Sequence, residues 1–479
     1  MHPDAAYAAL RARDARFDGR LFVGVTSTGI YCRPVCRVRT PRRENCRFFA
    51  TPAQAEVAAF RPCLKCRPEI APGLSQMDSS QALARSAAQL IEQSVHGEDA
   101  LSMPQVAQRL GVTDRHLRRI FQAEHGVAPR DWLATRRLLL AKQLLTDTQL
   151  PVTQVALASG FASLRRFNAA FVERYRLQPS RLRRERAQAA PDAPLRLAWR
   201  PPYDVDAVLG FFAQRALPGV EQVDGLALRR TLRMVHHGQA IDGWVEARFV
   251  PARHELELHA APALAPLLGP LLQRVRHWLD LDADPAAIDP VLALMPLPAR
   301  EGTRLPASLD GFELAVRVIL GQQVTVKAAR TLVTRLVERF GEPVATPFPA
   351  LTRLFPTAAV IAAADAEAIG LLGIVRQRVK AMQALAAAVA AGDIDLQRGA
   401  PLAATLQALT ALPGIGDWSA QLIAMRALAW PDAWPASDIG LMNALGSRDA
   451  KQITRQAEAW RPWRAYAVMR LWHHLENPT

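Results

Sequence analysis

The segment LPGIGDWSA at residues 412–420, followed by Asp438, decides the fold of the C-terminal half of this 479-residue chain. Ala and Leu at helical spacing on both sides predict two helices joined by a Pro-Gly-Ile-Gly hairpin. Glycine permits close approach of the backbone, so the amides of Gly414 and Gly416 can bind a DNA phosphate where the second helix begins. The hairpin alone fits an ordinary helix–helix turn equally well, and the later Asp438 favours DNA binding.

Outward from the hairpin, residues 301–479 are predicted to be helical and residues 195–300 to mix strands with helices. The strand-like runs are LRLAWR (195–200), WVEARFV (244–250) and HELELHA (254–260). The sequence thus predicts an α+β unit followed by an all-α unit.

Several separate motifs in this half resemble AlkA, the DNA-3-methyladenine glycosylase II family of the helix-hairpin-helix superfamily. They are WRPPYDVDAVLG (199–210), FELAVRVILGQQVTV (312–326), the hairpin, and WRPWRAYAVMRLW (460–472). The resemblance implies a TBP-like first subdomain and makes Asp438 the catalytic carboxylate, which stabilises an oxocarbenium-like sugar or positions water. It also implies a base pocket of Trp418, Trp472 and Phe211, and it places Gln323 in the gap left by the flipped base. Trp460 and Trp463 are expected to be core residues.

Two other functions compete with this interpretation. A transcription regulator with a catalytically inactive glycosylase half would not need Asp438, Trp418 or the glycine hairpin. An oxidised-base glycosylase/lyase with an iron–sulfur cluster needs four C-terminal cysteines, and no cysteine follows Cys66. Lyase members of the superfamily carry a lysine where this chain has Trp418, so a monofunctional glycosylase without an organic cofactor is expected.

Positive charge is concentrated in the N-terminal part of the chain. The chain has 59 basic and 44 acidic residues, a net charge of +15. Residues 1–190 contain 30 basic and 16 acidic residues, so they contribute +14 of that total. This asymmetry indicates a nucleic-acid-binding part joined to a nearly neutral part.

Residues 80–187 contain an internal repeat that predicts a duplicated helix-turn-helix. Val106-Ala107 recurs as Val155-Ala156, Gly111 as Gly160, Phe121 as Phe171, and Pro129 as Pro179. Ser102 and Gln105 fit a capping box. The second helices, near 114–121 and 163–171, carry side chains that can contact bases in the major groove: Arg115, His116, Arg118, Arg119, Arg165, Arg166 and Asn168.

Two packed amphipathic helix pairs with solvated arginines would explain one such unit, but two copies in a basic segment favour DNA binding. The repeat resembles the AraC-type double helix-turn-helix domain, including Gly126 and Pro129 before the connecting helix. The second copy has Arg176 in place of that glycine. Residues 188–194 are expected to be a linker.

All five cysteines precede residue 67, and four of them form two close pairs. Cys32 and Cys36, with Cys63 and Cys66, match a four-thiolate zinc site. The remaining Cys46 is expected to be a small core residue. No export signal and no apolar run of the roughly 18–20 residues of a membrane span is present. A bacterial cytoplasmic, nucleoid-associated protein without a membrane partner is therefore expected.

The residues around these cysteines resemble the N-terminal domain of the Ada family over roughly 5–72, within a predicted domain at 1–75. The resemblance rests on DGRLFVGVTSTGIYCRPVCRVRTPRRENCRFF and FRPCLKCRP. It implies that Cys32 irreversibly accepts a methyl group from a DNA methyl phosphotriester, with one zinc that is both structural and activating. Neighbouring arginines are expected to offset the negative thiolate cluster near DNA: Arg33, Arg37, Arg39, Arg42 and Arg43.

Together these features predict a multidomain, mainly α chain that fuses an Ada-like sensor to an AlkA-like glycosylase. Its domains are expected at 1–75, 80–187, 195–300 and 301–479. The expected partners are damaged DNA and promoter DNA, with RNA polymerase as a candidate. Ada itself carries a second cysteine methyltransferase, and the lack of cysteines after Cys66 excludes that activity here.

Overall fold

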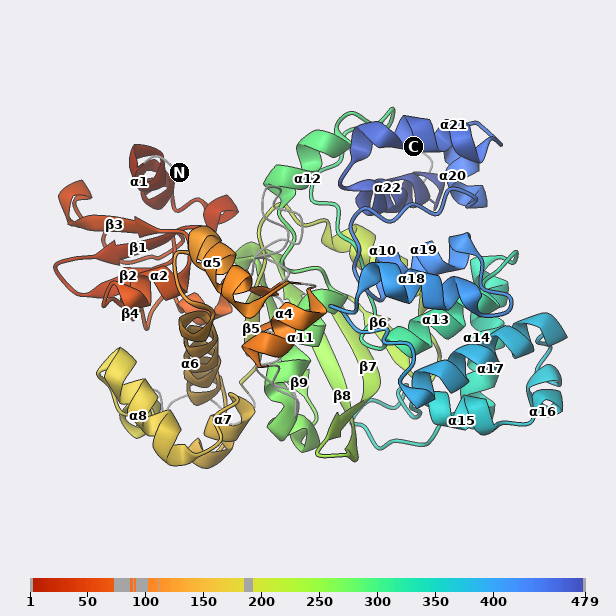
Figure 1. The fold of residues 1–479 in the computed structure, drawn as a ribbon, viewed down its shortest axis with the longest axis horizontal. Coiled ribbons are helices and arrows are strands. Elements are labelled where there is room, and N and C mark those ends of the chain that lie inside the picture. The colour runs from red at the N-terminus through yellow and green to blue at the C-terminus, as the bar shows by residue number, and fades with distance from the viewer. Residues whose placement is uncertain are drawn as a thin grey trace.

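The two sheets of the chain lie in different halves of the molecule. In the computed structural model, residues 3–72, 87–88, 90–91, 102–110, 112–184 and 193–476 are described. The elements before residue 185 form one side of the molecule, and the C-terminal elements form the other (Figure 1). Within the described ranges, no helix combines the length and apolarity that a bilayer crossing requires.

The N-terminal module is a small sheet covered by short helices. Its elements are α1 (Pro3–Ala12), β1 (Phe22–Val25), β2 (Ile30–Cys32), β3 (Cys46–Phe49), α2 (Pro52–Val57) and β4 (Arg61–Pro62). The strand order is β3-β1-β2-β4, with β4 parallel to β2. Because β2 ends at Cys32 and β4 ends directly before Cys63, the parallel pairing brings the two cysteine pairs together.

The helix-turn-helix repeat consists of α4 (Met103–Arg109), α5 (Asp114–His125), α6 (Pro129–Asp147), α7 (Val152–Ala158), α8 (Leu164–Tyr175) and α9 (Pro179–Arg184). The capping box at Ser102 and Gln105 is present. Arg176 adopts the left-handed conformation with φ 55°, as Gly126 does with φ 69°, so the substitution preserves the turn. Gly111, residues 185–187 at the end of the predicted repeat domain and residues 188–192 of the expected linker lie outside the described residues.

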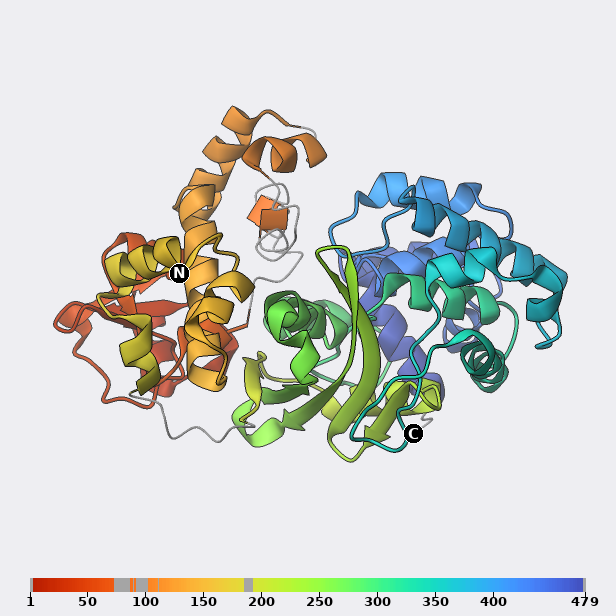
Figure 2. The same cartoon turned by 90° about the horizontal axis from the view of Figure 1, so that it is seen from below.

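The two repeat units belong to different hydrophobic cores. Leu117, Phe121 and Trp132 of the first unit pack in a cluster that includes Ala53 of the N-terminal module. Phe167 and Phe171 of the second unit belong to the large core of the C-terminal half. The long helix α6 runs between the two units (Figure 2). The duplicated unit therefore joins the N-terminal module to the C-terminal half.

The C-terminal half contains a five-stranded antiparallel sheet followed by a helical unit. The sheet unit comprises β5 (Leu195–Ala198), α10 (Val205–Arg215), β6 (Glu221–Asp224), β7 (Ala227–His236), β8 (Gln239–Val250), β9 (Glu255–Ala260), α11 (Leu268–Trp278) and α12 (Pro285–Leu292), with strand order β5-β9-β8-β7-β6. The sequence patterns predicted β5, β8 and β9, but not β6 and β7. Arginines in β7 obscure its apolar alternation, and several of them pair with carboxylates.

Ten helices complete the chain: α13 (Gly311–Leu320), α14 (Val326–Phe340), α15 (Ala358–Ala363), α16 (Ala366–Gly370), α17 (Arg376–Ala391), α18 (Leu402–Ala411), α19 (Asp417–Arg426), α20 (Ile439–Ala444), α21 (Ala450–Ala457) and α22 (Arg464–Glu476). The helices α18 and α19 form the predicted hairpin pair. The predicted helical character of this segment is confirmed.

A buried carboxyl group, Glu56 of α2, lies where the N-terminal module meets the helix-turn-helix repeat. Its oxygens accept hydrogen bonds from Tyr31 (2.9 Å), Thr135 (3.0 Å) and Tyr175 (3.3 Å). Arg174 lies 3.7 Å away. Burial raises the pKa of Glu56 from 4.5 to about 7, more than Arg174 and the hydroxyl donors lower it.

We expect the change in the free energy of unfolding caused by Glu56→Gln to be more favourable to the folded state at pH 8 than at pH 5. A carboxyl whose pKa is raised in the folded state binds more protons there than in the unfolded chain. Its contribution is therefore fully present below pH 4.5 and is lost as the pH rises through about 7. The shift corresponds to a change on the order of 2 kcal/mol between the two pH values. Thermal unfolding of wild type and variant measures it, with exposed Glu44→Gln as control. A pH-independent difference contradicts this assignment.

Candidate active site and metal centre

The Asp438 carboxylate is held by three hydrogen-bond donors. Oδ2 accepts from the indole N–H of Trp418 (3.0 Å), and Oδ1 accepts from the indole N–H of Trp472 (3.1 Å) and the amide of Leu441 (3.0 Å). Asp438 is 9% exposed and directly precedes α20. The structure thus brings together three residues that lie far apart in the sequence, and no cationic side chain among the described residues pairs with the carboxylate.

These residues line a cleft of about 1340 Å³ that also contains the hairpin and the Gln322–Thr325 loop. Phe211 is placed differently from the expectation. Its ring is 5% exposed and borders a smaller cavity behind Trp472, while Phe212 lines the large cleft. The guanidiniums of Arg215 and Arg426 lie over the Phe211 ring, with centroid distances of 3.9 and 4.7 Å. Phe211 therefore supports the pocket from behind.

The sequence predicted that two other tryptophans lie in the core. Trp460 and Trp463 are 2% and 3% exposed, as expected of core residues.

A Cβ added at Gly440 would lie 2.9 Å from Asp438 Oδ1 and 3.3 Å from the Trp472 ring. Because Gly440 has no side chain, the Asp438 carboxylate and the Trp472 indole can come into contact. The need for glycine follows from how closely α20 and α22 approach each other, so no sequence motif reveals it.

The hairpin places its two glycines at the surface. Gly414 has φ 78°, a left-handed conformation that favours glycine, and a Cβ there would lie 3.0 Å from Ala381. Gly416 directly precedes α19. Among the described residues, neither amide has a hydrogen-bond acceptor. Both N–H groups can therefore donate to an anion at the start of α19.

The Gly-Gln-Gln-Val loop is anchored to the hairpin. The Gln322 amide donates to the Gly414 carbonyl and to Ser419 Oγ, each at 2.9 Å. The next residue, Gln323, is exposed with φ 54°, and Val324 beside it is 36% exposed. An apolar side chain thus accompanies the polar Gln323 at the tip of this loop, and the sequence analysis had not identified it.

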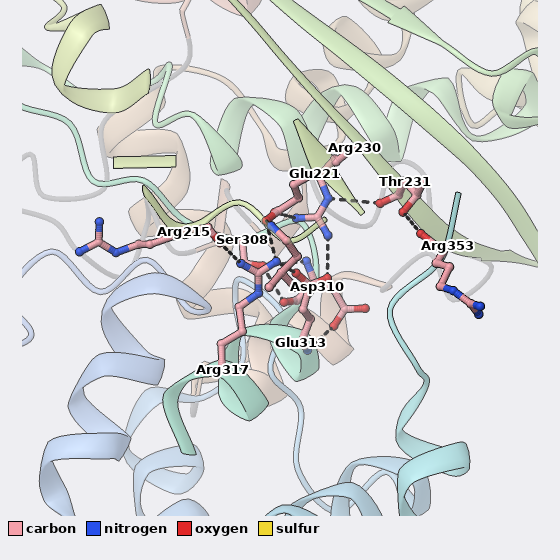
Figure 3. Close-up of polar contacts among 10 residues, drawn as sticks. Arg215, Glu221, Arg230, Thr231, Ser308, Asp310, Glu313, Arg317 and Arg353 are labelled. Atoms are coloured by element: carbon pink, nitrogen blue, oxygen red, sulfur yellow. Dashed lines mark hydrogen bonds and ion pairs between the residues drawn. The ribbon is translucent and has the colours of Figure 1, made fainter. Parts of the chain in front are cut away.

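A closed ring of four charges joins the two subdomains at the wall of the cleft (Figure 3). Arg230 of β7 bonds Glu221 at 2.8 Å and Glu313 of α13 at 2.6 Å. Arg317 of α13 bonds the same carboxylates at 2.7 and 2.5 Å. All four groups are largely buried. Removing one member would leave one buried charge in excess among the other three, at a cost of about 3–5 kcal/mol.

The four paired cysteines meet in the N-terminal module. The sulfurs of Cys32, Cys36, Cys63 and Cys66 all lie within 4.8 Å of one another. Four thiolates at this spacing match the tetrahedral sulfur set that zinc prefers. Cys46 lies outside this group, where its thiol donates to the Arg42 carbonyl (3.3 Å) and packs in a separate apolar cluster.

One of the arginines expected to face DNA near the cysteines is buried. Arg33 is 5% exposed, forms an ion pair with Asp18, and donates to the Cys66 carbonyl at 3.0 Å. Its guanidinium therefore lies in the interior beside the cysteine cluster and does not face DNA. Arg43 is half-buried over Tyr7 and Phe48. The exposed members of the set are Arg37, Arg39 and Arg42.

The side chains proposed to contact bases lie on α5 and α8. His116 is half-buried, and the six others are exposed: Arg115, Arg118, Arg119, Arg165, Arg166 and Asn168. Arg118 also forms an exposed ion pair with Asp114 at 2.9 Å. Such pairs contribute little to stability, so these side chains are free to exchange partners.

Comparison with known families assigns each part of the chain. The metal binding domain of Ada matches residues 5–69, and a helix-turn-helix domain matches 106–185. The AlkA N-terminal domain matches 194–310, and the HhH-GPD superfamily of base excision DNA repair proteins matches 316–463. These matches confirm the predicted resemblance to Ada, AraC-type regulators and AlkA.

Curated relatives show the same combination. The chain is 37% identical to the probable bifunctional transcriptional activator/DNA repair enzyme AlkA of Mycobacterium tuberculosis, over 100% of this chain and 98% of that protein. It is 34% identical to DNA-3-methyladenine glycosylase 2 of Escherichia coli, over 58% of this chain and 96% of the relative. The Escherichia coli transcriptional activator and repair enzyme Ada is 33% identical over 33% of this chain and 42% of its own length.

The chain therefore belongs to the family of bifunctional AlkA/Ada-like proteins, in which an Ada-type zinc methyl-acceptor domain and a helix-turn-helix regulator domain are joined to a 3-methyladenine DNA glycosylase domain.

Proposed function

We propose that Asp438 is the catalytic carboxylate of a monofunctional glycosylase that hydrolyses the N-glycosidic bond of alkylated bases of the 3-methyladenine type. The observation that carries the proposal is the carboxylate clamped between the indole N–H groups of Trp418 and Trp472 in the cleft. Neutral donors leave the full negative charge on Asp438. That charge stabilises the positive charge that develops on the sugar as the base departs.

The same arrangement positions the base. Trp418 and Trp472 both border the cleft and point their indole edges at Asp438, so a flipped base between them would lie beside the carboxylate. An alkylated cationic base is attracted to an indole face. As the C1′–N bond breaks, its electron pair goes to the base, and water bonds C1′ while losing a proton toward Asp438.

The hairpin and the Gln322–Thr325 loop are proposed to hold the DNA open. The unpaired amides of Gly414 and Gly416 would bind a backbone phosphate, which positions the duplex without reading its sequence. Gln323, together with exposed Val324, would fill the gap left by the flipped nucleotide. The Gln322 bonds to Gly414 and Ser419 keep these two DNA contacts at a fixed spacing.

The N-terminal module is proposed to accept a methyl group at Cys32 from a DNA methyl phosphotriester. Cys32, Cys36, Cys63 and Cys66 would together hold one zinc ion, which keeps the sulfurs deprotonated and therefore nucleophilic. The Cys32 sulfur forms a bond to the methyl carbon while the carbon–oxygen bond to phosphate breaks. Arg33 supports this site through Asp18.

Promoter recognition is proposed to use α5 and α8, with direct base contacts from the exposed side chains at 115, 118, 119, 165, 166 and 168. RNA polymerase remains a candidate partner of this regulator half, and an inactive glycosylase half remains the alternative function. The intact Asp438 clamp supports catalysis over that alternative.

We expect Asp438→Asn to abolish base excision from methylated DNA while leaving DNA binding intact, because the amide lacks the negative charge that stabilises the sugar cation. Gly440→Ala should lower excision at least tenfold, because its methyl group displaces Asp438 or Trp472. The measurement is single-turnover release of methylated bases. Gly370→Ala tests the general cost of a methyl group elsewhere, since Gly370 has open space around it and does not adopt a positive φ. Full activity of Asp438→Asn would show that Asp438 is not the catalytic carboxylate, whereas an inactive wild type would favour the inactive-glycosylase alternative.

We expect no strand cleavage by the protein itself. A lyase needs an amine that forms a Schiff base with the sugar, and Trp418 occupies the position of that lysine. Borohydride treatment during the reaction should therefore trap no covalent protein–DNA adduct. An adduct, mapped by mass spectrometry to a lysine of the cleft, would contradict this expectation.

Methylation of Cys32 should raise DNA affinity roughly tenfold at low salt, with a smaller gain as the salt concentration rises. Alkylation turns an anionic thiolate into a neutral thioether, so one negative charge near the DNA phosphates disappears, and screening reduces the effect. A salt titration compares the chain before and after reaction with a methyl phosphotriester duplex, with modification at Cys32 verified by mass. Equal affinities at low salt would show that the charge does not control binding.

A further inference from the structure

Besides Asp438, the base-excision cleft is lined by five guanidiniums and three carboxylates. These eight side chains are Arg215, Glu221, Arg230, Glu313, Arg317, Arg330, Arg426 and Glu476. Arg230 and Arg317 share Glu221 and Glu313 in the closed ring (Figure 3). Arg215 bonds Glu476 at 2.8 Å. Among the described residues, Arg330 and Arg426 are the guanidiniums of this lining without a carboxylate partner, and Arg330 is exposed on α14 whereas Arg426 is half-buried.

Arg426 is nevertheless fixed in place. It ends α19 and lies on the same helix face as Trp418 and Leu422, eight and four residues earlier, and all three line the cleft. Its Nε donates to the Pro306 carbonyl at 3.0 Å, and its guanidinium covers the Phe211 ring. The terminal nitrogens have no acceptor among the described residues. They form an oriented donor pair on the same wall as Trp418.

The environment leaves the positive charge of Arg426 uncompensated. Burial, together with nearby Arg215 and Arg317, lowers the pKa of Arg426 to about 9. Glu221 and Glu313 raise the pKa of Arg426 and so offset part of this lowering, but their oxygens already bond the ring arginines. Arg426 is half-buried, and a partly desolvated cation without a partner reduces stability. Such a group is retained at a functional site when a ligand supplies the missing acceptor.

We propose that Arg426 determines which leaving bases the glycosylase accepts, by donating to an acceptor atom of the flipped base and so favouring neutral bases over cationic ones. The proposal rests on the glycosylase reaction assigned to Asp438 and adds a second charged group at the base end of the cleft. Arg330, the other guanidinium of the lining without a carboxylate partner among the described residues, is exposed on α14, whereas the bond to Pro306 holds Arg426 in place.

Charge movement in the reaction explains the preference. When C1′–N9 of a neutral keto purine breaks, the electron pair stays on the base, which becomes an anion shared between its ring nitrogens and keto oxygen. A guanidinium N–H bonded to that anion stabilises the transition state, and the base then takes a proton from water. A cationic base becomes neutral as it leaves, so it needs no such donor, and Arg426 repels it in the bound state.

A purely structural role makes a different prediction. If Arg426 only anchored α19 to Pro306 and covered Phe211, its removal would loosen the cleft for every substrate. Both kinds of base would then be excised more slowly by the same factor. The ratio between the two rates, together with substrate binding, therefore separates the two roles.

The experiment compares wild type with Arg426→Met on two matched duplexes, one with hypoxanthine as the neutral base and one with 7-methylguanine as the cationic base. Methionine keeps an unbranched side chain but removes the charge and the donors. Single-turnover rates and duplex affinities are measured separately for each substrate. Arg426→Lys restores the charge without the planar fork, and Arg455→Met removes an exposed arginine of α21 as a control. Thermal unfolding of each variant reports its stability.

We expect Arg426→Met to lower the hypoxanthine rate at least tenfold and to change the 7-methylguanine rate less than threefold, with unchanged or tighter binding of the cationic duplex. Arg426→Lys should restore part of the hypoxanthine rate. Equal factors for both bases, or no effect on either, would overturn the proposal, as would a wild-type protein that does not excise hypoxanthine. If the proposed glycosylase function itself were wrong, wild type and Asp438→Asn would be equally inactive on both duplexes, which distinguishes that failure from failure of the Arg426 proposal.

Discussion

Buried guanidinium groups hold the modules of this chain together. Arg67, next to the cysteine cluster, bonds Asp147 of α6 at 2.5 and 2.7 Å, and Arg230 bonds Glu313 across the two subdomains of the glycosylase half. Arg200 has no exposed surface and donates to the carbonyls of Asp18 (3.0 Å) and Asp282 (2.7 Å). A buried guanidinium without partners is costly, so each junction holds only when both sides provide their acceptors.

These contacts also connect the cysteine cluster to the glycosylase half. Arg33 donates from the cluster to the Asp18 carboxylate (2.8 Å), and the carbonyl of the same residue accepts from Arg200. One residue away from Arg33, Cys32 is the proposed methyl acceptor. Arg20 adds an ion pair to Asp284 at 2.6 Å. The metal centre is therefore anchored on the repair enzyme as well as on the helix-turn-helix repeat, and the large core includes the second repeat unit.

The sequence predicted the parts of the site that local patterns encode. The cysteine spacing identified all four clustered sulfurs, and the resemblance to AlkA singled out Asp438 and the two indoles whose N–H groups bond it. These predictions succeed because the chemistry restricts residue type at fixed spacing. Phe211 was expected in the pocket but lies behind it. Its neighbour Phe212 has the same residue type, and only the rotation of α10 decides which ring faces the cleft.

The features that the sequence did not predict depend on pairings between distant segments. Arg33 was expected to face DNA, but Asp18 draws it into the interior. Strand β7 was missed because its arginines pair with carboxylates of β6, β8 and α13, and Gly440 matters only because α22 places Trp472 against it. Such partners cannot be assigned from one sequence, since many arginines and many carboxylates are available for pairing.

The electrostatics of the cleft match the direction in which charge moves during glycosidic cleavage. Asp438 receives only neutral donors, so its negative charge remains available where the sugar becomes positive. Three of the five guanidiniums that line the cleft bond carboxylates, and Arg426, on the same helix as Trp418, is the proposed donor to the base as it gains electrons. Both groups are held by bonds to rigid helices, so neither must reorganise during the reaction. An electric field that is negative at the sugar and positive at the base assists the departure of a neutral base most. A cationic base already leaves readily, because bond cleavage neutralises its charge.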